Sequence, residues 1–412
     1  YTSTPFTAVQ SRLPSMTNPT HGQPRIAVII ERIGPYHRAR MEALARRVPV
    51  LAIETCTVDE TYLWASETAG AFARATLFPT LAEARVVPRL KRALDRELRA
   101  FKPDVIAIPG WADPAGLLAF AWARERGTPV IIISDSQAID QRRMPIAEAV
   151  KRGVVGMASA GFVAGRTHAD YLSALGMPRD RIAFGYDVVD NDHFVRGAEA
   201  ARADPAIRAR LDLPARYLIS VSRFVEKKNL ETLVEAHARW SQTVEDPVPL
   251  VLVGDGPLRN ALERQAGPAV YLRSFADYSE LPALYGLAEG FVLSSTVEQW
   301  GLTVNEAMAA GCPVIASDRA GATAELVEDG VTGIVAAPTV EGLSAAITRL
   351  FQADPASLAS AAHARIAAWG PERFVDGMLK AAWVAMSRRE RIHVPQPLAG
   401  IALAALARRV SA

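Results

Sequence analysis

The sequence predicts an α/β protein made of two Rossmann-like domains, each with a doubly wound parallel sheet. The chain has 412 residues, about twice the length that one ordinary hydrophobic core organises. Short runs of Val, Ile and Leu alternate with segments of helical period, as in parallel sheets whose strands are buried on both faces. After Phe194 a polar stretch rich in Ala and Arg interrupts the alternation, which then starts again. The restart indicates a second sheet.

The expected strands are short apolar runs in both halves of the chain. They cover residues 25–30, 50–53, 105–108 and 130–133 in the first half, and 217–221, 250–253, 291–293 and 314–316 in the second. Helical patterns over 38–47, 81–100 and 115–126 separate the first set. This order favours right-handed crossovers with helices on both faces of each sheet. Ligands of such sheets bind beyond the carboxyl ends of the strands, so the site is expected there.

The domain boundaries follow from the same pattern. Residues 1–23, rich in Ser, Thr and Pro, predict a mobile tail, and residues 24–195 predict the first domain. Residues 196–385 predict the second domain. It ends in a helix that begins near Glu372, after Pro371, and packs back on the first domain. Residues 386–412 predict a C-terminal tail.

The composition is that of a soluble globular enzyme, with half of the residues hydrophobic and 22% charged. The net charge of +2 gives no reason to expect a nucleic-acid partner. Cys56 and Cys312 provide neither a disulfide framework nor the spacing of a metal site, which favours a reducing compartment. We find no apolar run long enough for a signal peptide or a membrane-spanning helix, and we expect a cytoplasmic protein.

The segment from Glu298 to Glu306 carries most of the functional argument. It joins a loop, which follows an expected strand, to a helix that begins at Gly301. The N–H groups and positive dipole end of such a helix can hold a phosphate. The two carboxylates would face different parts of one ligand and accept hydrogen bonds from sugar and ribose hydroxyls. The alternative is that Glu306 is an exposed helix residue and Glu298 an ordinary loop charge.

A basic loop follows the expected strand 217–221. Arg223 and Lys228 lie five positions apart and can converge on a pyrophosphate, Arg as a fork and Lys as a point charge. A basic loop by itself is usually solvated surface. Here the turn Gly254-Asp-Gly-Pro257 follows the next strand at the same edge of the sheet, which supports a phosphate site.

Together these motifs resemble the retaining GT-B glycosyltransferases of glycosyltransferase family 4. The resemblance spans nearly all of residues 25–390 and is strongest from Ser220 to Gly333. There the Arg-x₄-Lys pair, the Gly-x-Gly-Pro turn, the Glu-x₇-Glu motif and Gly-x-Pro-Val-Ile-Ala occur in the family's order and spacing. The resemblance implies the GT-B fold, with a cleft between the two domains and a C-terminal helix that crosses back. It also implies transfer of a sugar from a nucleoside diphosphate sugar to an acceptor hydroxyl with retention of configuration, in polysaccharide or glycolipid assembly.

The resemblance also implies roles for individual residues. Glu306 would hold the ribose and Glu298 the donor sugar, while Arg223 and Lys228 would neutralise the diphosphate leaving group. The remaining donor-binding positions would be the amides of Gly301, Leu302 and Thr303, the base contacts Arg273 and Phe275, and the close-approach loop at Gly34. Fixed cations and helix-end amides stabilise the departing charge without reorganisation, so we expect neither a metal nor another cofactor.

The first domain departs from the family pattern at three points. Its first loop has one glycine, Gly34, where many relatives have a pair. Asp135 stands where many relatives place a His near the donor sugar. It could accept sugar hydroxyls or stabilise positive charge at the anomeric carbon, and the alternative is a strand-end turn or cap residue. The stretch from Asp187 to Asp192 only partly matches the family's Asn-Gly-Val-Asp hinge.

Other functions stay open at the level of the sequence. A nucleotide-sugar epimerase or a non-catalytic partner subunit could share this fold. The partner subunit is disfavoured because the chain keeps the full set of Arg223, Lys228, Glu298 and Glu306. Asp190-Asn-Asp192 spells a metal–nucleotide motif of another glycosyltransferase fold, and we interpret it as structural. A dehydrogenase fingerprint would begin at Gly254, but Arg259 occupies its third glycine position.

The acceptor is expected to be a sugar or a lipid-linked sugar. Between residues 85 and 99 basic side chains punctuate an apolar helical stripe, and such helices can lie on anionic membranes. One hypothesis is therefore contact with the inner face of the membrane. The alternative is an amphipathic helix packed on the sheet with its basic face in water.

Overall fold

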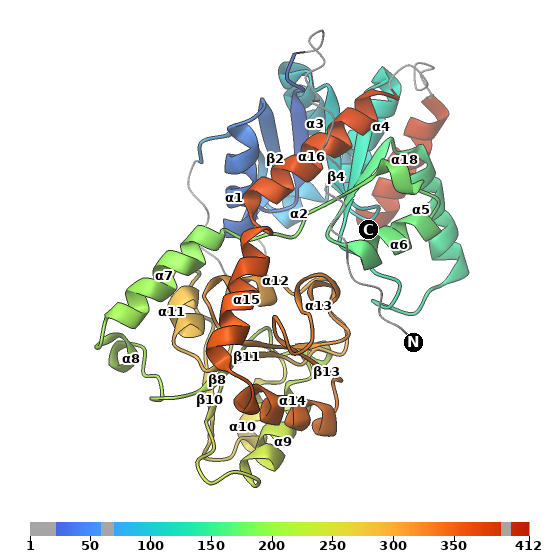
Figure 1. Cartoon of the computed structure of the whole chain (residues 1–412). Coiled ribbons are helices and arrows are strands. Elements are labelled where there is room, and N and C mark those ends of the chain that lie inside the picture. The colour runs from blue at the N-terminus through green and yellow to red at the C-terminus, as the bar shows by residue number, and fades with distance from the viewer. Residues whose placement is uncertain (1–21, 59–69, 389–396, 412) are drawn as a thin grey trace.

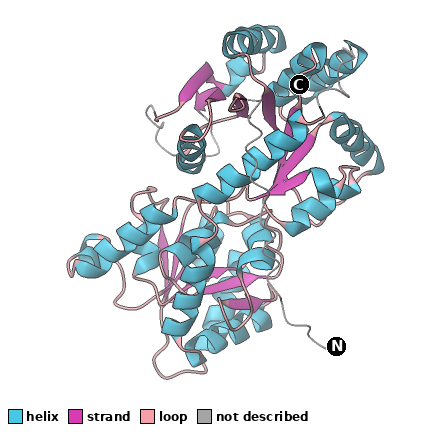
Figure 2. Ribbon diagram, turned by 45° about the horizontal axis from the view of Figure 1, so that its top comes forward, coloured by secondary structure: helices cyan, strands magenta, loops and turns pink. Residues whose placement is uncertain are grey.

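The computed structural model describes residues 22–58, 70–388 and 397–411. The tail expected for residues 1–23 thus lies, up to residue 21, outside the described residues. Figure 1 shows two α/β domains, one above the other, with helix α16 lying across the upper one. In Figure 2 the strands of each domain are flanked by helices.

The first sheet has seven parallel strands in the order β3-β2-β1-β4-β5-β6-β7. They are β1 (Ile26–Ile30), β2 (Val50–Val58), β3 (Ala73–Thr80), β4 (Val105–Pro109), β5 (Val130–Ser134), β6 (Ala160–Val163) and β7 (Ile182–Phe184). The chain winds outward from β1 in one direction and from β4 in the other. Loops after β1 and β4 therefore diverge and leave a crevice at the carboxyl edge.

The helices of this domain are α1 (Pro35–Ala45), α2 (Leu81–Ala84), α3 (Val87–Phe101), α4 (Pro114–Arg126), α5 (Pro145–Met157), α6 (Arg166–Ala174) and the short η1 (Arg179–Arg181). The segment expected as one helix over 81–100 is divided, since Pro88 opens a second helix at its N-terminal end.

The second sheet has six parallel strands in the order β10-β9-β8-β11-β12-β13. They are β8 (Leu218–Val221), β9 (Leu250–Val253), β10 (Val270–Arg273), β11 (Gly290–Leu293), β12 (Val314–Ser317) and β13 (Ile334–Ala336). The strands expected from apolar runs are all present in the two sheets.

The remaining helices complete the second domain and the return to the first. They are α7 (Asn191–Ala203), α8 (Ile207–Arg210), η2 (Glu226–Lys228), α9 (Leu230–Ser241), α10 (Arg259–Gln265), α11 (Leu281–Gly286), α12 (Leu302–Ala309), α13 (Gly321–Leu326), α14 (Val340–Gln352), α15 (Pro355–Ala367), α16 (Pro371–Met386) and α18 (Pro397–Ser411).

Helix α16 fastens the second domain to the first. Its Phe374 packs edge-on against Phe162 of β6, with ring centroids 5.2 Å apart, and Met378 is also buried. One continuous hydrophobic cluster runs through α16 and both sheets. The C-terminal helix therefore crosses back, as the fold class predicts. Further on, in the segment expected as a tail, α18 buries Leu403 and packs on α4.

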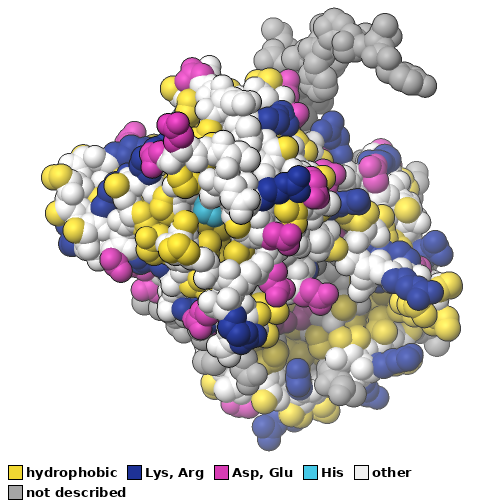
Figure 3. Space-filling model, turned by 90° about the horizontal axis from the view of Figure 1, so that it is seen from below, with side chains coloured by type: hydrophobic (Ala, Val, Ile, Leu, Met, Phe, Trp, Pro, Cys, Tyr) yellow, Lys and Arg dark blue, Asp and Glu magenta, His cyan; other side chains and the backbone are white. Residues whose placement is uncertain are grey.

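Helix α3 packs its apolar stripe against the core of the first domain. Leu90, Leu94 and Leu98 are buried in the core of the first domain, while the basic side chains between them face outward. The packed amphipathic helix is thus what the structure shows, and the stripe is not available to lipid. On the face seen in Figure 3, Lys and Arg side chains are interspersed with Asp and Glu. Within the described residues, every helix is too short or too polar to span a membrane.

Candidate functional site

The site lies where the carboxyl ends of the two sheets face each other. From the second domain come the loop after β8, the turn after β9 and the start of α12. From the first domain come the loops after β1, β5 and β7. Each of these segments follows a buried parallel strand, which fixes where its first residues point.

The turn after β9 holds the basic loop after β8 in place. Gly254 and Gly256 have φ of +142° and +154°, a region that side chains rarely adopt. A Cβ at Gly254 would lie 1.9 Å from the carbonyl oxygen of Ser222, next to Arg223. Phe224 N–H also donates to the carbonyl of Asp255 at 2.8 Å. The two glycines therefore allow the close approach that positions the exposed Arg223 at the edge of the sheet.

Lys228 and Glu298 form an ion pair at the centre of the second domain's edge. Ser295 also donates to the same carboxylate oxygen of Glu298, at 3.0 Å. Both side chains are largely buried, at 15% and 10% exposure, so the pair is screened weakly. The structure thus brings together a cation and a carboxylate that the sequence placed in separate motifs.

Gly301 makes the start of α12 accessible. Gly301 is the N-cap of α12 and has a left-handed backbone, with φ of +99°. A Cβ at this position would meet the Leu293 side chain at 3.0 Å. Leu302 and Thr303 then form the first helical positions, where backbone N–H groups lack intrahelical acceptors. This geometry provides an anion-binding helix start beside the Lys228–Glu298 pair.

Glu306 is fully buried and is not an exposed helix residue. Its Oε1 accepts a hydrogen bond from the Tyr36 hydroxyl of the first domain, and its Oε2 accepts one from Tyr285 at 2.7 Å. Burial raises the pKa of Glu306, whereas the two phenol hydrogen bonds lower it. Both oxygens that would bind a ribose are therefore engaged by tyrosines in this conformation.

The two residues expected near the base lie at the end of β10. The guanidinium of Arg273 donates to the carbonyl of Leu211, while Phe275 in the following loop is 41% exposed. Phe275 is thus a free aromatic surface on which a planar ring can stack. Arg273 would have to leave Leu211 to reach a ligand.

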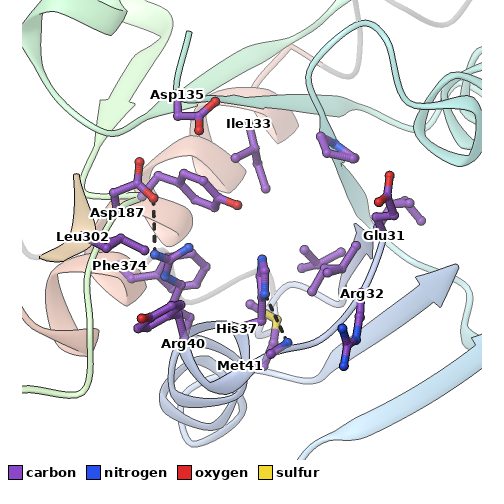
Figure 4. A pocket seen from close by; sticks show the side chains of 17 residues that line it. Glu31, Arg32, His37, Arg40, Met41, Ile133, Asp135, Asp187, Leu302 and Phe374 are labelled. Carbon is purple, nitrogen blue, oxygen red and sulfur yellow. Dashed lines mark hydrogen bonds and ion pairs between the residues drawn. The ribbon is translucent and has the colours of Figure 1, made fainter. Parts of the chain in front are cut away.

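Gly34 and Asp135 lie on the first domain's side. Gly34 is the N-cap of α1 with an extended backbone, and its N–H donates to Nδ1 of His37 at 3.4 Å. Asp135 directly follows β5 and is exposed. Both line a cavity of about 450 Å³ whose walls come from the first domain, α16 and Leu302 (Figure 4).

Asp187 is a further cavity residue that the sequence did not single out as functional. Its Oδ1 accepts from Arg40 at 3.3 Å, and burial raises the pKa of Asp187 to about 7 against the lowering effect of Arg40. Burial lowers the pKa of the neighbouring His37 to about 3. His37 is therefore neutral near pH 7.

Direct hydrogen bonds hold the two domains together beside the site. Gln137 donates to the carbonyls of Glu298 and Gln299, at 2.9 and 2.7 Å, and His168 Nε2 lies 2.8 Å from the Gln299 carbonyl. These contacts tie the Glu298 loop to the first domain. Sequence reasoning missed them, and the only available signal was the position of Gln137 two residues after Asp135.

The Asp-x-Asp sequence has a structural role at its first position. Asp190 is the N-cap of α7 and accepts a hydrogen bond from the His193 N–H at 3.2 Å. The side chains of Cys56 and Cys312 are buried and form no disulfide. Among the described residues, no three His, Cys, Asp or Glu side chains group as metal ligands would.

The fold and site together define a nucleotide-dependent enzyme of the GT-B type. Its two doubly wound sheets face each other across the start of α12, the Lys228–Glu298 pair and a cavity large enough for a sugar. Residues 205–365 match the family model of glycosyl transferases group 1, and residues 33–185 match that of the glycosyl transferase 4-like domain. The chain belongs to these GT-B glycosyltransferases and is a nucleotide-sugar-dependent glycosyltransferase.

Individual relatives agree with this assignment. The alpha-D-kanosaminyltransferase of Streptomyces kanamyceticus is 28% identical over 318 residues, which are 73% of this chain and 77% of the relative. A GDP-mannose-dependent phosphatidylinositol monomannoside mannosyltransferase of Mycobacterium tuberculosis is 32% identical over 240 residues, 55% of this chain and 61% of the relative. In structure, the chain resembles sucrose-phosphate synthase from Thermosynechococcus elongatus with a TM-score of 0.68, at 20% identity over 86% of this chain and 97% of that one.

Proposed function

We propose that the chain transfers a sugar from a nucleoside diphosphate sugar to an acceptor hydroxyl with retention of anomeric configuration and without a metal ion. The observation that carries this proposal is the Lys228–Glu298 pair beside the open N-terminus of α12. In this proposal Lys228, Arg223 and the amides of Gly301, Leu302 and Thr303 stabilise the departing diphosphate. Glu298 binds the donor sugar once the diphosphate competes for Lys228.

The reaction needs little covalent help from the protein. As the sugar–phosphate bond breaks, positive charge develops on the sugar ring and negative charge on the diphosphate. Preorganised cations and amides stabilise that negative charge, and removing one such group costs about 3–4 kcal/mol of barrier in comparable sites. Attack from the donor face lets the acceptor hydroxyl pass its proton to a phosphate oxygen. In this proposal Asp135, which is exposed directly after β5, stabilises the positive charge on the ring.

The acceptor belongs to the same proposal. The relatives' names include a kanosaminyltransferase, a mannosyltransferase of phosphatidylinositol monomannoside and a glycogen synthase, which span sugar and lipid acceptors. If the acceptor is lipid-linked, the exposed basic face of α3 offers a contact for anionic lipid headgroups through Arg89, Lys91 and Arg92. Flotation with anionic vesicles tests this contact. Binding should fade at high salt and on replacement of these three residues by Ser, and a protein that never floats at low salt would exclude it.

The function itself is tested by ligand-induced stabilisation. We expect UDP, GDP or ADP to raise the melting temperature in EDTA, because ligand binding to the native state stabilises it by mass action. Transfer from the corresponding nucleotide sugar should also persist in EDTA. Activity that disappears with the chelator and returns with Mg²⁺ or Mn²⁺ would contradict metal independence, and failure of all three nucleotides to bind would contradict the proposed function.

A further inference from the structure

Two buried side chains of the first domain hold the Glu298 loop, residues 294–301. Gln137 lies two residues after Asp135, in the loop after β5. Its side-chain amide donates to the carbonyls of Glu298 and Gln299, at 2.9 and 2.7 Å. His168 of α6 has its Nε2 2.8 Å from the same Gln299 carbonyl. Gln137 and His168 are only 3% and 1% exposed, so water competes little for these hydrogen bonds.

The start of α6 fixes the tautomer of His168. Its Nδ1 accepts a hydrogen bond from the N–H of Gly165 at 3.2 Å, so the proton of the neutral ring lies on Nε2. Burial lowers the pKa of His168, against the raising effect of the hydrogen bond to Gln299. The imidazole is therefore a neutral donor to the Gln299 carbonyl.

The second domain supplies only part of the hydrogen bonding of these two carbonyls. The Glu298 carbonyl also accepts from the N–H of Gly321, at 3.3 Å. Within the described ranges, the Gln299 carbonyl has its donors, Gln137 and His168, in the first domain. A Cβ on Gly321 would lie 2.2 Å from the Gln299 carbonyl oxygen, so this glycine allows α6 to approach α13 (Figure 1). The backbone of the loop thus depends on the first domain for its position.

The held backbone leads directly to the side chain of Glu298. That carboxylate pairs with Lys228 and accepts from Ser295 at 3.0 Å. With the carbonyls of residues 298 and 299 fixed as well, few orientations remain for the Glu298 side chain. Gln137 and Asp135 share one loop, so the same hydrogen bonds tie the position of Asp135 to that of Glu298.

We propose that Gln137 and His168 are positioning residues for sugar transfer, which hold the Glu298 loop so that Glu298 meets the donor sugar in one orientation. The inference rests on the proposed function for the role of Glu298. A misplacement of about 1 Å at a reacting group can lower a rate roughly a hundredfold. The groups proposed to bind the diphosphate belong to the second domain, so the affinity for a nucleoside diphosphate should depend little on Gln137 and His168.

Release of UDP from UDP-glucose and of GDP from GDP-mannose by the full chain, followed without an acceptor, measures bond cleavage with water as the nucleophile. Gln137→Met keeps the length of the side chain and removes the donor. It should lower kcat about ten- to a hundredfold and leave the Kd of UDP or GDP close to the wild-type value. His168→Phe should lower kcat less, because Gln137 still holds both carbonyls.

Gln137→Glu distinguishes positioning from a general structural role. A carboxylate cannot donate to a carbonyl, whereas the protonated acid donates one hydrogen bond. Relative to the wild type at the same pH, kcat of this variant should therefore rise between pH 8 and pH 5. Gln137→Met should show no such recovery.

Arg166→Ala is the matched control. Arg166 also joins the two domains, through Glu325 at 3.1 Å and the Ala324 carbonyl at 2.7 Å, but it does not contact the Glu298 loop. Its side chain is 65% exposed, and exposed ion pairs contribute little, so kcat should stay near the wild-type value. A loss of kcat as large as that of Gln137→Met would show that any weakening of domain closure has the same effect, and would overturn the inference.

Two further results would overturn it. One is wild-type kcat in Gln137→Met, and the other is a rise in nucleotide Kd that matches the loss of kcat. Amide hydrogen exchange of residues 294–301 gives a readout that needs no substrate. Exchange should be faster in Gln137→Met than in the wild type and in Arg166→Ala, and equal exchange in all three would contradict the inference. A wild type that binds neither nucleotide or cleaves neither sugar derivative would count against the proposed function, while hydrogen exchange would still test the positioning of the loop.

Discussion

The hydroxyl of Tyr36 donates a hydrogen bond to Oε1 of Glu306 across the interdomain cleft. Tyr36 belongs to the first turn of α1 and Glu306 to α12, so the bond joins the two domains at the carboxylate that, by the family resemblance, is expected to bind the ribose. Tyr36 also packs edge-on against Tyr278, with centroids 5.6 Å apart. A donor can reach Glu306 only when Tyr36 moves away.

We therefore expect Tyr36→Phe to tighten nucleotide binding. The variant removes a hydrogen bond that competes with the ribose, worth about 0.5–1.5 kcal/mol net, or roughly two- to tenfold in Kd. Isothermal titration with the nucleoside diphosphate measures the change. Tyr171→Phe is the matched control, because Tyr171 also donates to a buried glutamate, Glu148, outside the site. Unchanged or weaker binding in Tyr36→Phe would show that Tyr36 does not compete with the nucleotide.

Lys228→Ala should lower turnover much more than it weakens nucleotide binding. The negative charge on the diphosphate grows as the bond breaks, so a lost cation costs most in the transition state, about 3–4 kcal/mol. Glu306→Ala should show the reverse pattern, since a ribose contact is similar in the ground and transition states.

The control for this pair is Lys227→Ala. In the wild type, the Nζ of Lys227 lies 3.3 Å from the side-chain oxygen of Gln299 and not at the carboxylate of Glu298. Steady-state kinetics and nucleotide Kd separate the two effects. Wild-type kcat in the Lys228 variant would remove this lysine from the mechanism.

His37 should make the first domain sensitive to acid. Its folded pKa of about 3 lies below the ordinary value of 6.5, so the unfolded chain binds a proton that the folded one excludes. The contribution to stability is complete above about pH 6.5 and is lost as the pH falls toward 3, by up to about 1.4 kcal/mol per pH unit. Asp187, with a folded pKa of about 7, has the opposite effect. Its contribution to the stability of the fold is lost as the pH rises from about 4 to 7.

Melting temperatures at pH 5.0 and 7.5 test this prediction. His37→Gln keeps an acceptor near Gly34 and cannot ionise, so it should lose less stability than the wild type between pH 7.5 and 5.0. His363→Gln, a histidine on α15 away from the cavity, is the control. An equal acid loss in wild type and His37→Gln would contradict the assignment.

The sequence predicted those parts of the fold and site that are encoded in short segments. The buried central strands appeared as Val/Ile runs, whereas β3 was missed because this edge strand is half-exposed and contains Pro79. β6 was missed as well, since it has only four residues, one of them Gly161. Lys228 and Glu298 could be proposed from the sequence because each lies in a local motif that follows a strand, and the structure brings the two side chains together. The Tyr36–Glu306 contact joins residues 270 positions apart, and no local pattern signals it.

Gly254→Ala should destabilise the second domain and damage the phosphate loop together. The residue combines φ of +142° with a Cβ position 1.9 Å from the carbonyl oxygen of Ser222, so a methyl group forces the loop after β8 away from the turn after β9. Strain of this kind costs about 1–3 kcal/mol, and the displaced backbone would carry Arg223 with it. We expect a lower melting temperature and weaker nucleotide binding in the same variant. Gly267→Ala, at a position with open space around its Cβ and no positive φ, should change neither. If Gly254→Ala melts like the wild type and binds nucleotide normally, the close approach of the two loops does not position Arg223.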